Sequence, residues 1–177
     1  MKNKDIKTRI KEFFFLNPTI KLRVRQMERE IKIPLPSAIR YTKELEQEKI
    51  LKSTVIANVN FYSADRTSDT FLLEKKLFNI KYLFSSGLIN NLIEELSNPA
   101  IIVFGSFSKG EDIEKSDIDI YIESPTKKQV NLEKFERKIG RKIQIFIYKN
   151  INEVNNKNLA NNIINGTILS GFIKIFE

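Results

Sequence analysis

Apolar residues in the first third of the chain recur at the spacing of amphipathic helices. The pattern predicts a helix over residues 5–16, which Asn17-Pro18 ends, a second over 23–31, and a third that begins at Ser37. The positions predicted to face inward are Ile6, Ile10, Phe13, Phe14, Val24, Met27, Ile31, Ala38, Leu45 and either Tyr41 or Thr42. About fifty residues are therefore expected to form three packed helices.

The pattern then changes to β-branched and aromatic runs. The stretch "ILKSTVIANVNFYSA", residues 50–64, carries two such runs on either side of Ala57-Asn58, which predicts a hairpin. Helical spacing returns over residues 68–97, with a break at 85–87. We interpret the Leu and Phe stripe of this connection as core rather than as a ligand pocket.

From residue 99 onward the pattern predicts short strands of one sheet, at residues 100–105, 117–123 and 143–147. The first is the apolar run "AIIVF", which ends in Gly105-Ser106. The second alternates, so that Ile118, Ile120 and Ile122 share one face, and Asp117, Asp119, Tyr121 and Glu123 share the other. The predicted fold class is α/β (α+β).

Charge is unevenly distributed along the 177 residues, whose net charge is +8. Residues 1–66 hold 15 Lys and Arg against 8 Asp and Glu, whereas residues 67–177 hold 15 against 14. This asymmetry favours a polyanion-binding module joined to a more neutral domain, although Lys-rich faces are often only solvated. We therefore predict two domains, residues 1–66 and 67–177.

Composition limits the chemistry that the chain can perform. It has no histidine and no cysteine, which excludes imidazole bases, thiolate metal sites and disulfides. Catalysis would rest on carboxylates, hydroxyls, lysines or a hard cation. The longest apolar runs are too short for a membrane span, and the first residues lack the apolar region of a signal peptide, so we expect a cytoplasmic protein without membrane contact.

The stretch "FGSFSKGEDIEKSDIDIYIE", residues 104–123, carries the candidate chemistry. A glycine after a strand lets the backbone approach a bulky anion, and a serine adds a hydroxyl. Asp117 and Asp119 lie about 6.6 Å apart along one strand face, so both carboxylates can reach one divalent cation. The alternative is an exposed edge strand that carries solvating acids.

Gly-Ser, ten residues and then Asp-x-Asp resembles the signature of the minimal nucleotidyltransferases of the DNA polymerase beta superfamily. The resemblance extends from residue 99 to about 175, because "NLANNIINGTILSGFIKIF" is similar to the family's closing helix and strand. It implies a small mixed β-sheet flanked by helices, catalytic and metal-binding roles for Asp117 and Asp119 with Mg²⁺ or Mn²⁺, and an NTP substrate. The residues implied to bind the nucleotide are Gly105, Ser106, Lys109 and Ser116. It also implies a helical partner protein encoded nearby.

One position departs from the family pattern. Active members usually carry a third acidic residue on the next strand, and here that position falls at Gln144. Glu123 cannot replace it, because it lies about 13 Å beyond Asp119 on the same strand. Glu111 and Asp112 are nearer in the sequence, but they belong to a loop whose course the sequence does not predict. Two functions stay open: a Mg²⁺-dependent nucleotidyltransferase that moves a nucleoside monophosphate to an unidentified acceptor, and a catalytically weak or inactive transcriptional regulator or antitoxin-like protein with this fold.

Three helices followed by a hairpin resemble a winged helix-turn-helix domain. The resemblance implies that the third helix enters the major groove of double-stranded DNA and that the hairpin contacts the backbone. The DNA-binding candidates are Arg23, Arg25, Ser37, Arg40, Tyr41, Lys43, Lys52 and Ser53. The alternative is a helical domain whose basic residues face water or a protein partner.

Overall fold

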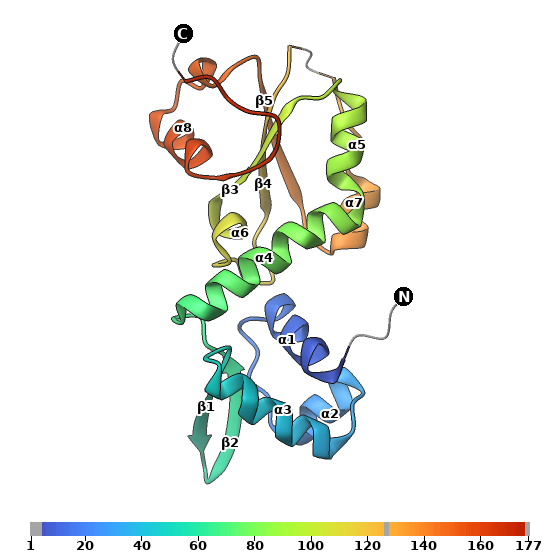
Figure 1. Ribbon diagram of the computed structural model, residues 1–177, viewed down its shortest axis with the longest axis vertical. Coiled ribbons are helices and arrows are strands. Elements are labelled where there is room, and N and C mark those ends of the chain that lie inside the picture. The colour runs from blue at the N-terminus through green and yellow to red at the C-terminus, as the bar shows by residue number, and fades with distance from the viewer. Residues whose placement is uncertain (1–4, 126–127, 176–177) are drawn as a thin grey trace. The chain divides into compact units, whose positions relative to one another are not determined.

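The computed structural model describes residues 5–125 and 128–175. The chain separates into two compact units, Met1–Phe78 and Asn79–Glu177 (Figure 1). This division falls within helix α4 (Asp69–Ser86), whereas the boundary expected from the sequence lies at residues 66/67. Each unit contains a hydrophobic core of its own.

The N-terminal unit has the element order of a winged helix. Its elements are α1 (Ile6–Leu16), α2 (Val24–Ile31), α3 (Leu35–Gln47), β1 (Leu51–Ile56) and β2 (Val59–Ala64). The two strands pair antiparallel, and an isolated bridge joins Leu22 to Tyr62. The predicted sequence of three helices and a hairpin is confirmed.

The core of this unit comes from the predicted helix faces. Ile10, Phe14, Met27, Ile31, Ala38 and Leu45 are buried, and Ile6, Phe13 and Val24 are partly buried against them. Thr42 is fully buried, whereas Tyr41 is only half-buried, so Thr42 is the inward residue of that pair. The third helix begins at Leu35, two residues before its predicted start at Ser37. The prolines in this stretch do not prevent the earlier start, because the first turn of a helix needs no partner for its N–H groups.

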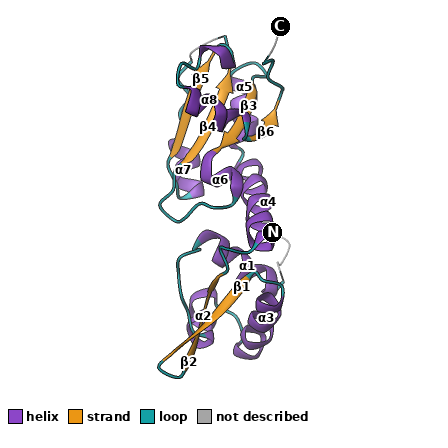
Figure 2. Cartoon of the chain, turned by 90° about the vertical axis from the view of Figure 1, so that its left-hand side faces the viewer, coloured by secondary structure: helices purple, strands orange, loops and turns teal. Residues whose placement is uncertain are grey.

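The hairpin turns on two residues with left-handed backbone angles. Ala57 has φ of 46° and Asn58 has φ of 59°, which are the signs that a two-residue type I′ turn requires. This turn matches the right-handed twist of the strands, so β1 and β2 stay paired as far as the two turn residues. Figure 2 shows the hairpin extending beyond the helices of its own unit.

The C-terminal unit is built on one mixed sheet. Its strands are β3 (Ala100–Phe104), β4 (Ile118–Glu123), β5 (Ile143–Tyr148) and β6 (Thr167–Ser170), in the order β5-β4-β3-β6. β4 runs antiparallel to β3 and parallel to β5. Because β4 is an internal strand, the interpretation of its acidic residues as an exposed edge was wrong.

Helices cover both faces of this sheet. One face carries the isoleucines of β4 and packs on the end of α4, α5 (Leu88–Glu95) and α7 (Glu133–Ile139). The other face packs on the short helix Ile151–Glu153 and on α8 (Lys157–Ile164). Tyr121 belongs to this second core and is fully buried. The sheet face that carries Asp119 is therefore covered in part by this second core and exposed elsewhere.

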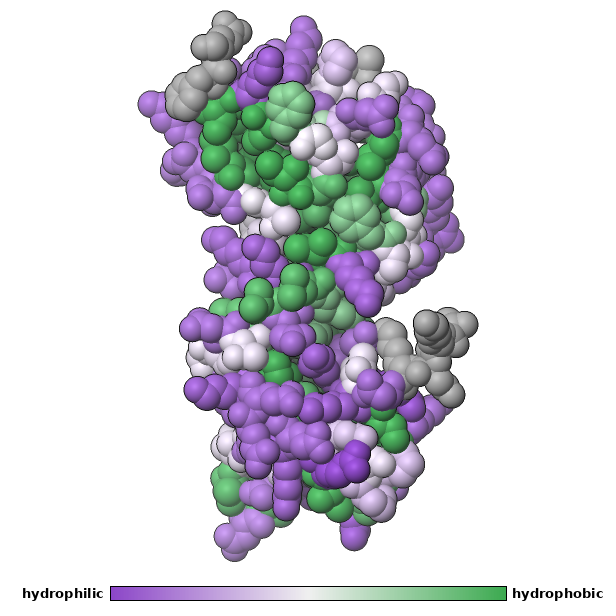
Figure 3. All heavy atoms as spheres, in the orientation of Figure 1, coloured by the Kyte–Doolittle hydropathy of each residue, from purple (hydrophilic) through white to green (hydrophobic). Residues whose placement is uncertain are grey.

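Within residues 5–125 and 128–175, no helix is both long enough and apolar enough to cross a bilayer. The face of the N-terminal unit drawn in Figure 3 is mainly hydrophilic.

Candidate functional site

Gly105 brings the two halves of the motif into contact. It follows β3 at the start of the short helix α6 (Gly105–Lys109), and its φ of +71° favours glycine. A Cβ at this position would lie 2.7 Å from Oδ2 of Asp119. Phe104 and Asp119 are register partners on β3 and β4, so the Gly-Ser turn begins beside the second aspartate.

The two aspartates affect each other electrostatically. Burial raises the pKa of the Asp119 carboxyl above its usual value, and the negative charge of Asp117 raises this pKa further. Asp119 is half-buried, whereas Asp117, just before β4, is exposed. A cation between the two carboxylates would remove this repulsion, and carboxylate oxygens suit a hard cation such as Mg²⁺.

Gln144 lies beside Asp119, as the sequence predicts. The parallel register of β4 and β5 pairs Asp119 with Gln144, whose side chain is exposed. Across the described part of the chain, no group of three or more His, Cys, Asp or Glu residues is placed to hold a metal ion. The side chains around Asp119 that could hold a cation are the carboxylates of Asp117 and Asp119 and the neutral amide of Gln144.

The remaining nucleotide-binding candidates lie on both sides of the loop between α6 and β4. Ser106 is half-buried in α6, and Lys109 is exposed at the end of that helix. The Oγ of Ser116 accepts a hydrogen bond of 3.0 Å from the backbone N–H of Ile113. Ser116 thus closes the turn that leads into Asp117.

Glu123 is engaged away from Asp119. Its Oε2 accepts a hydrogen bond of 3.0 Å from the hydroxyl of Tyr121. Burial and then the charge of Glu123 raise the pKa of Tyr121 well above its usual value, so this phenol stays protonated and donates. Glu123 therefore belongs to a separate polar pair on the second core.

One buried polar network was not found from the sequence. Arg141 contacts Oδ2 of Asp112 at 2.8 Å, and their side chains are 7% and 0% exposed. Asn79 donates a hydrogen bond of 2.7 Å to Oδ1 of Asp112. The sequence placed Asp112 in a loop without indicating its course, and a partner 29 positions away in the chain has no local signal.

Most of the DNA-binding candidates lie on α3 and its surroundings. Lys43 and Arg25 are exposed, and Ser37 is half-buried in the first turn of α3. The guanidinium of Arg23 lies 4.9 Å from the centre of the Phe61 ring. Lys52 forms an ion pair of 3.4 Å with Asp65, and Ser53 is exposed beside it on β1.

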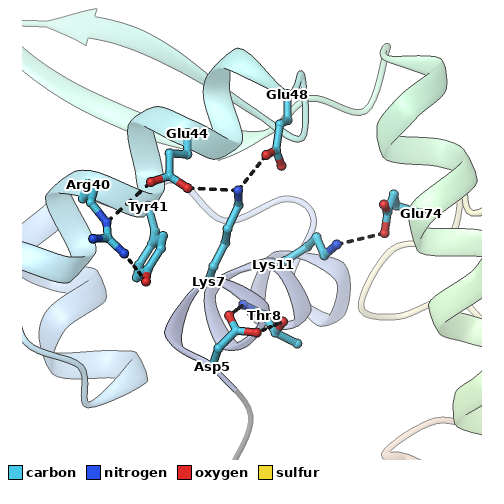
Figure 4. A network of polar contacts seen from close by, with 9 residues as sticks. All are labelled: Asp5, Lys7, Thr8, Lys11, Arg40, Tyr41, Glu44, Glu48 and Glu74. Carbon is cyan, nitrogen blue, oxygen red and sulfur yellow. Dashed lines mark hydrogen bonds and ion pairs between the residues drawn. The ribbon is translucent and has the colours of Figure 1, made fainter.

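Arg40 is oriented by its neighbours on α3. Its guanidinium lies over the ring of Tyr41 at 4.2 Å, donates to the hydroxyl of Tyr41, and approaches Glu44 at 3.5 Å (Figure 4). Glu44 and Glu48 are also neutralised by Lys7 of α1, at 3.0 and 2.6 Å. Glu44, in the last turn of α3, and Glu48, just after the helix, are thus paired, while Lys43 is exposed.

Comparison with known proteins gives one finding, and it concerns the C-terminal unit. No curated protein and no solved structure matches the chain. The N-terminal unit lies outside the matched region, so its winged-helix character rests on its structure alone. The segment of residues 86–169, which contains Gly105, Asp117 and Asp119, matches the family model of the nucleotidyltransferase domain.

Proposed function

We propose that the protein is a Mg²⁺-dependent nucleotidyltransferase that moves a nucleoside monophosphate from an NTP to an acceptor. The observation that carries this proposal is the contact between the Gly105 turn and Asp119, where a Cβ would lie 2.7 Å from the carboxylate oxygen. Such close approach brings the turn and the Asp119 carboxylate within reach of one ligand. The family match of residues 86–169 supports the same reaction class.

The residues present fit a hard divalent cation. Asp117 and Asp119 supply carboxylate oxygens, and Gln144 adds a neutral amide oxygen at the register position beside Asp119. When bound, Mg²⁺ or Mn²⁺ would neutralise charge on the triphosphate. The carboxylates would hold this cation, and neutralising and positioning the triphosphate is most of what phosphoryl transfer requires of a protein.

The other residues of the motif are assigned to the phosphates. Gly105 and Ser106 would contact the triphosphate through backbone N–H groups and a hydroxyl, and exposed Lys109 would add a positive charge. Ser116 would act by fixing the turn before Asp117. None of these residues needs to form a covalent bond with the substrate.

Gln144 favours a second candidate function. A glutamine cannot accept a proton and brings no charge, so the attacking hydroxyl lacks an acidic neighbour at this position. A protein with this site could bind nucleotide and regulate transcription, or act as an antitoxin-like protein, with weak or absent turnover. In that case nucleotide binding would still depend on Asp119.

The two functions are separated by one experiment. The protein is incubated with each labelled NTP and Mg²⁺ or Mn²⁺, together with DNA, RNA or the products of neighbouring genes, including any helical partner protein. Transfer of label that is absent from Asp119→Asn supports the enzyme. Metal-dependent NTP binding without transfer supports the regulator, and no Asp119-dependent binding at all contradicts both.

The N-terminal unit is proposed to bind double-stranded DNA. The excess of Lys and Arg in residues 1–66 and the exposed side chains of α3 support this role. In this proposal α3 lies in the major groove, with Ser37, Arg40, Tyr41 and Lys43 towards the DNA. Lys52 on the hairpin, and Arg23 and Arg25 at the start of α2, would contact phosphates.

A further inference from the structure

The loop between α6 and β4 is tied down by a buried charged network. Asp112 lies in this loop and Arg141 precedes β5, and the two side chains form an ion pair of 2.8 Å with almost no exposure. Asn79 of α4 donates to the other carboxylate oxygen at 2.7 Å. Both oxygens of Asp112 thus have protein partners, so this carboxylate is not a substitute for the missing metal ligand.

The same network reaches both halves of the Gly-Ser and Asp-x-Asp motif. The side chain of Asn79 also donates to the carbonyl oxygen of Phe107 in α6, at 2.9 Å. Arg141 also donates to the carbonyl oxygen of Ser116, directly before Asp117, at 3.5 Å. Its guanidinium lies 5.6 Å from the centre of the Phe107 ring. Three side chains therefore connect α6, which carries Ser106, with the turn that carries Asp117.

A buried ion pair usually stabilises a fold no more than apolar residues of similar volume would. Desolvation of the two charges offsets much of their attraction, and well-packed apolar residues often stabilise such a position equally well or better. What the pair adds is geometry, since a guanidinium fixes the directions of its hydrogen bonds. Here one nitrogen of the guanidinium, Nη1, lies 2.8 Å from Oδ2 of Asp112 and donates to the carbonyl oxygen of Ser116, next to a candidate metal ligand.

We propose that Asn79, Asp112 and Arg141 are positioning residues that hold Asp117 at the distance from the Gly105-Ser106 turn that metal-bound NTP requires. This inference rests on the proposed nucleotide-binding function of the site. Asp117 is exposed and precedes β4, so the strand hydrogen bonds alone fix it less well than Asp119. The contacts of Asn79, Asp112 and Arg141 restrict the turn before Asp117, which the strand hydrogen bonds alone leave less well fixed.

The test compares variants of this network, made in the chain of residues 1–177, with a matched control. Asp112→Asn leaves Arg141 buried opposite a neutral side chain and could fail to fold. The double variant Asp112→Asn/Arg141→Met removes both charges and keeps the volume, so it should retain the fold. Affinity for the Mn²⁺ complex of each NTP is measured by titration calorimetry, and the melting temperature is measured in parallel. Lys138→Met is the matched control, because Lys138 donates to the carbonyl oxygen of Ser86 at 2.8 Å in the same unit.

We expect the double variant to melt near the wild-type temperature and to bind Mn²⁺–NTP about tenfold or more weakly, as found when residues behind metal ligands are changed. Lys138→Met should bind like the wild type whatever its melting temperature, and Arg141→Lys should keep more affinity than Arg141→Met. If wild-type binding requires Asp119 but the folded double variant binds normally, the network is only structural and the inference is overturned. If wild-type binding does not require Asp119, the proposed function fails and the inference fails with it.

Discussion

At the scale of single residues, the site depends on one glycine position where a side chain would not fit. Gly105 combines a left-handed backbone with a carboxylate at contact distance, and either feature alone would favour glycine. Asp119 can therefore lie beside the turn instead of being displaced from it. Because of this contact, Gly105 and Asp119 belong to the same candidate site, although the whole α6–β4 loop separates them in the sequence.

Gly105→Ala tests this contact. The added Cβ would meet Oδ2 of Asp119 at 2.7 Å and would occupy a left-handed conformation. We expect a loss of about 1 to 3 kcal/mol in the free energy of unfolding from the backbone strain, and loss of metal-dependent NTP binding from the displaced carboxylate. Denaturant unfolding and calorimetry measure the two effects. Gly140→Ala is the control, since its φ is +76° but no atom lies within 4 Å of the added Cβ.

A second prediction concerns Gln144. Gln144→Asp would place a third carboxylate beside Asp119, at the register partner on β5. We expect the rate of nucleotidyl transfer to rise by about 10²-fold, the lower end of what a positioned general base contributes. The matched variant Gln144→Asn, which stays neutral, should show no gain. Robust wild-type turnover that survives Gln144→Ala would contradict this account, because the third carboxylate would then come from elsewhere or be unnecessary.

At the scale of elements, hydrophobic periodicity was sufficient for most helices and strands. The buried positions of α1, α2 and α3 recur at helical spacing, and the isoleucines of β4 alternate along the sequence, so each element carries its own pattern. α6 and α7 were not predicted, because five and seven residues are too few for a periodic signal. Burial of Tyr121 was also missed, since a strand pattern does not indicate whether a second layer covers its polar face.

The candidate site was predictable only as far as its contacts are local in the sequence. Gly-Ser and Asp-x-Asp are separated by ten residues and carry a recognisable spacing. The ion pair of Asp112 and Arg141 joins a loop to the distant segment before β5, and its residue types are common on protein surfaces. Nothing in the sequence distinguishes these two charges from the many solvated ones.

A prediction at this scale concerns the joint between α8 and β6. A Cβ at Gly166 would lie 2.6 Å from Cγ2 of Ile102 and 2.7 Å from the carbonyl oxygen of Val103. Gly166→Ala should therefore push β6 away from β3 and lower the free energy of unfolding by about 1 to 3 kcal/mol, the usual cost of overpacking. Asn162→Ala, on an exposed position of α8, should change it by less than about 0.5 kcal/mol. Equal unfolding curves for the two variants would show that β6 is not packed this closely.

At the scale of the whole molecule, the chain joins two units with different charge. Nearly all of the excess positive charge lies in residues 1–66, whereas residues 67–177 are close to neutral. A catalytic domain that binds NTP through a metal needs no strongly basic surface of its own. The basic charge of the N-terminal unit therefore supports the proposal of a separate polyanionic ligand, and its helix and hairpin arrangement supports duplex DNA as that ligand.

The last prediction tests that ligand through the salt dependence of DNA affinity. Each lost phosphate contact should reduce the slope of log affinity against log salt concentration by about 0.9. Lys43→Ala should show this change, because Lys43 is exposed on α3. Arg40→Ala should have a smaller effect on the slope, since Glu44 already lies 3.5 Å from its guanidinium. Lys149→Ala, which removes an exposed lysine of the C-terminal unit, should leave the slope unchanged. Equal slopes for wild type and Lys43→Ala would mean that Lys43 does not contact a phosphate, which contradicts the proposed placement of α3 on the DNA.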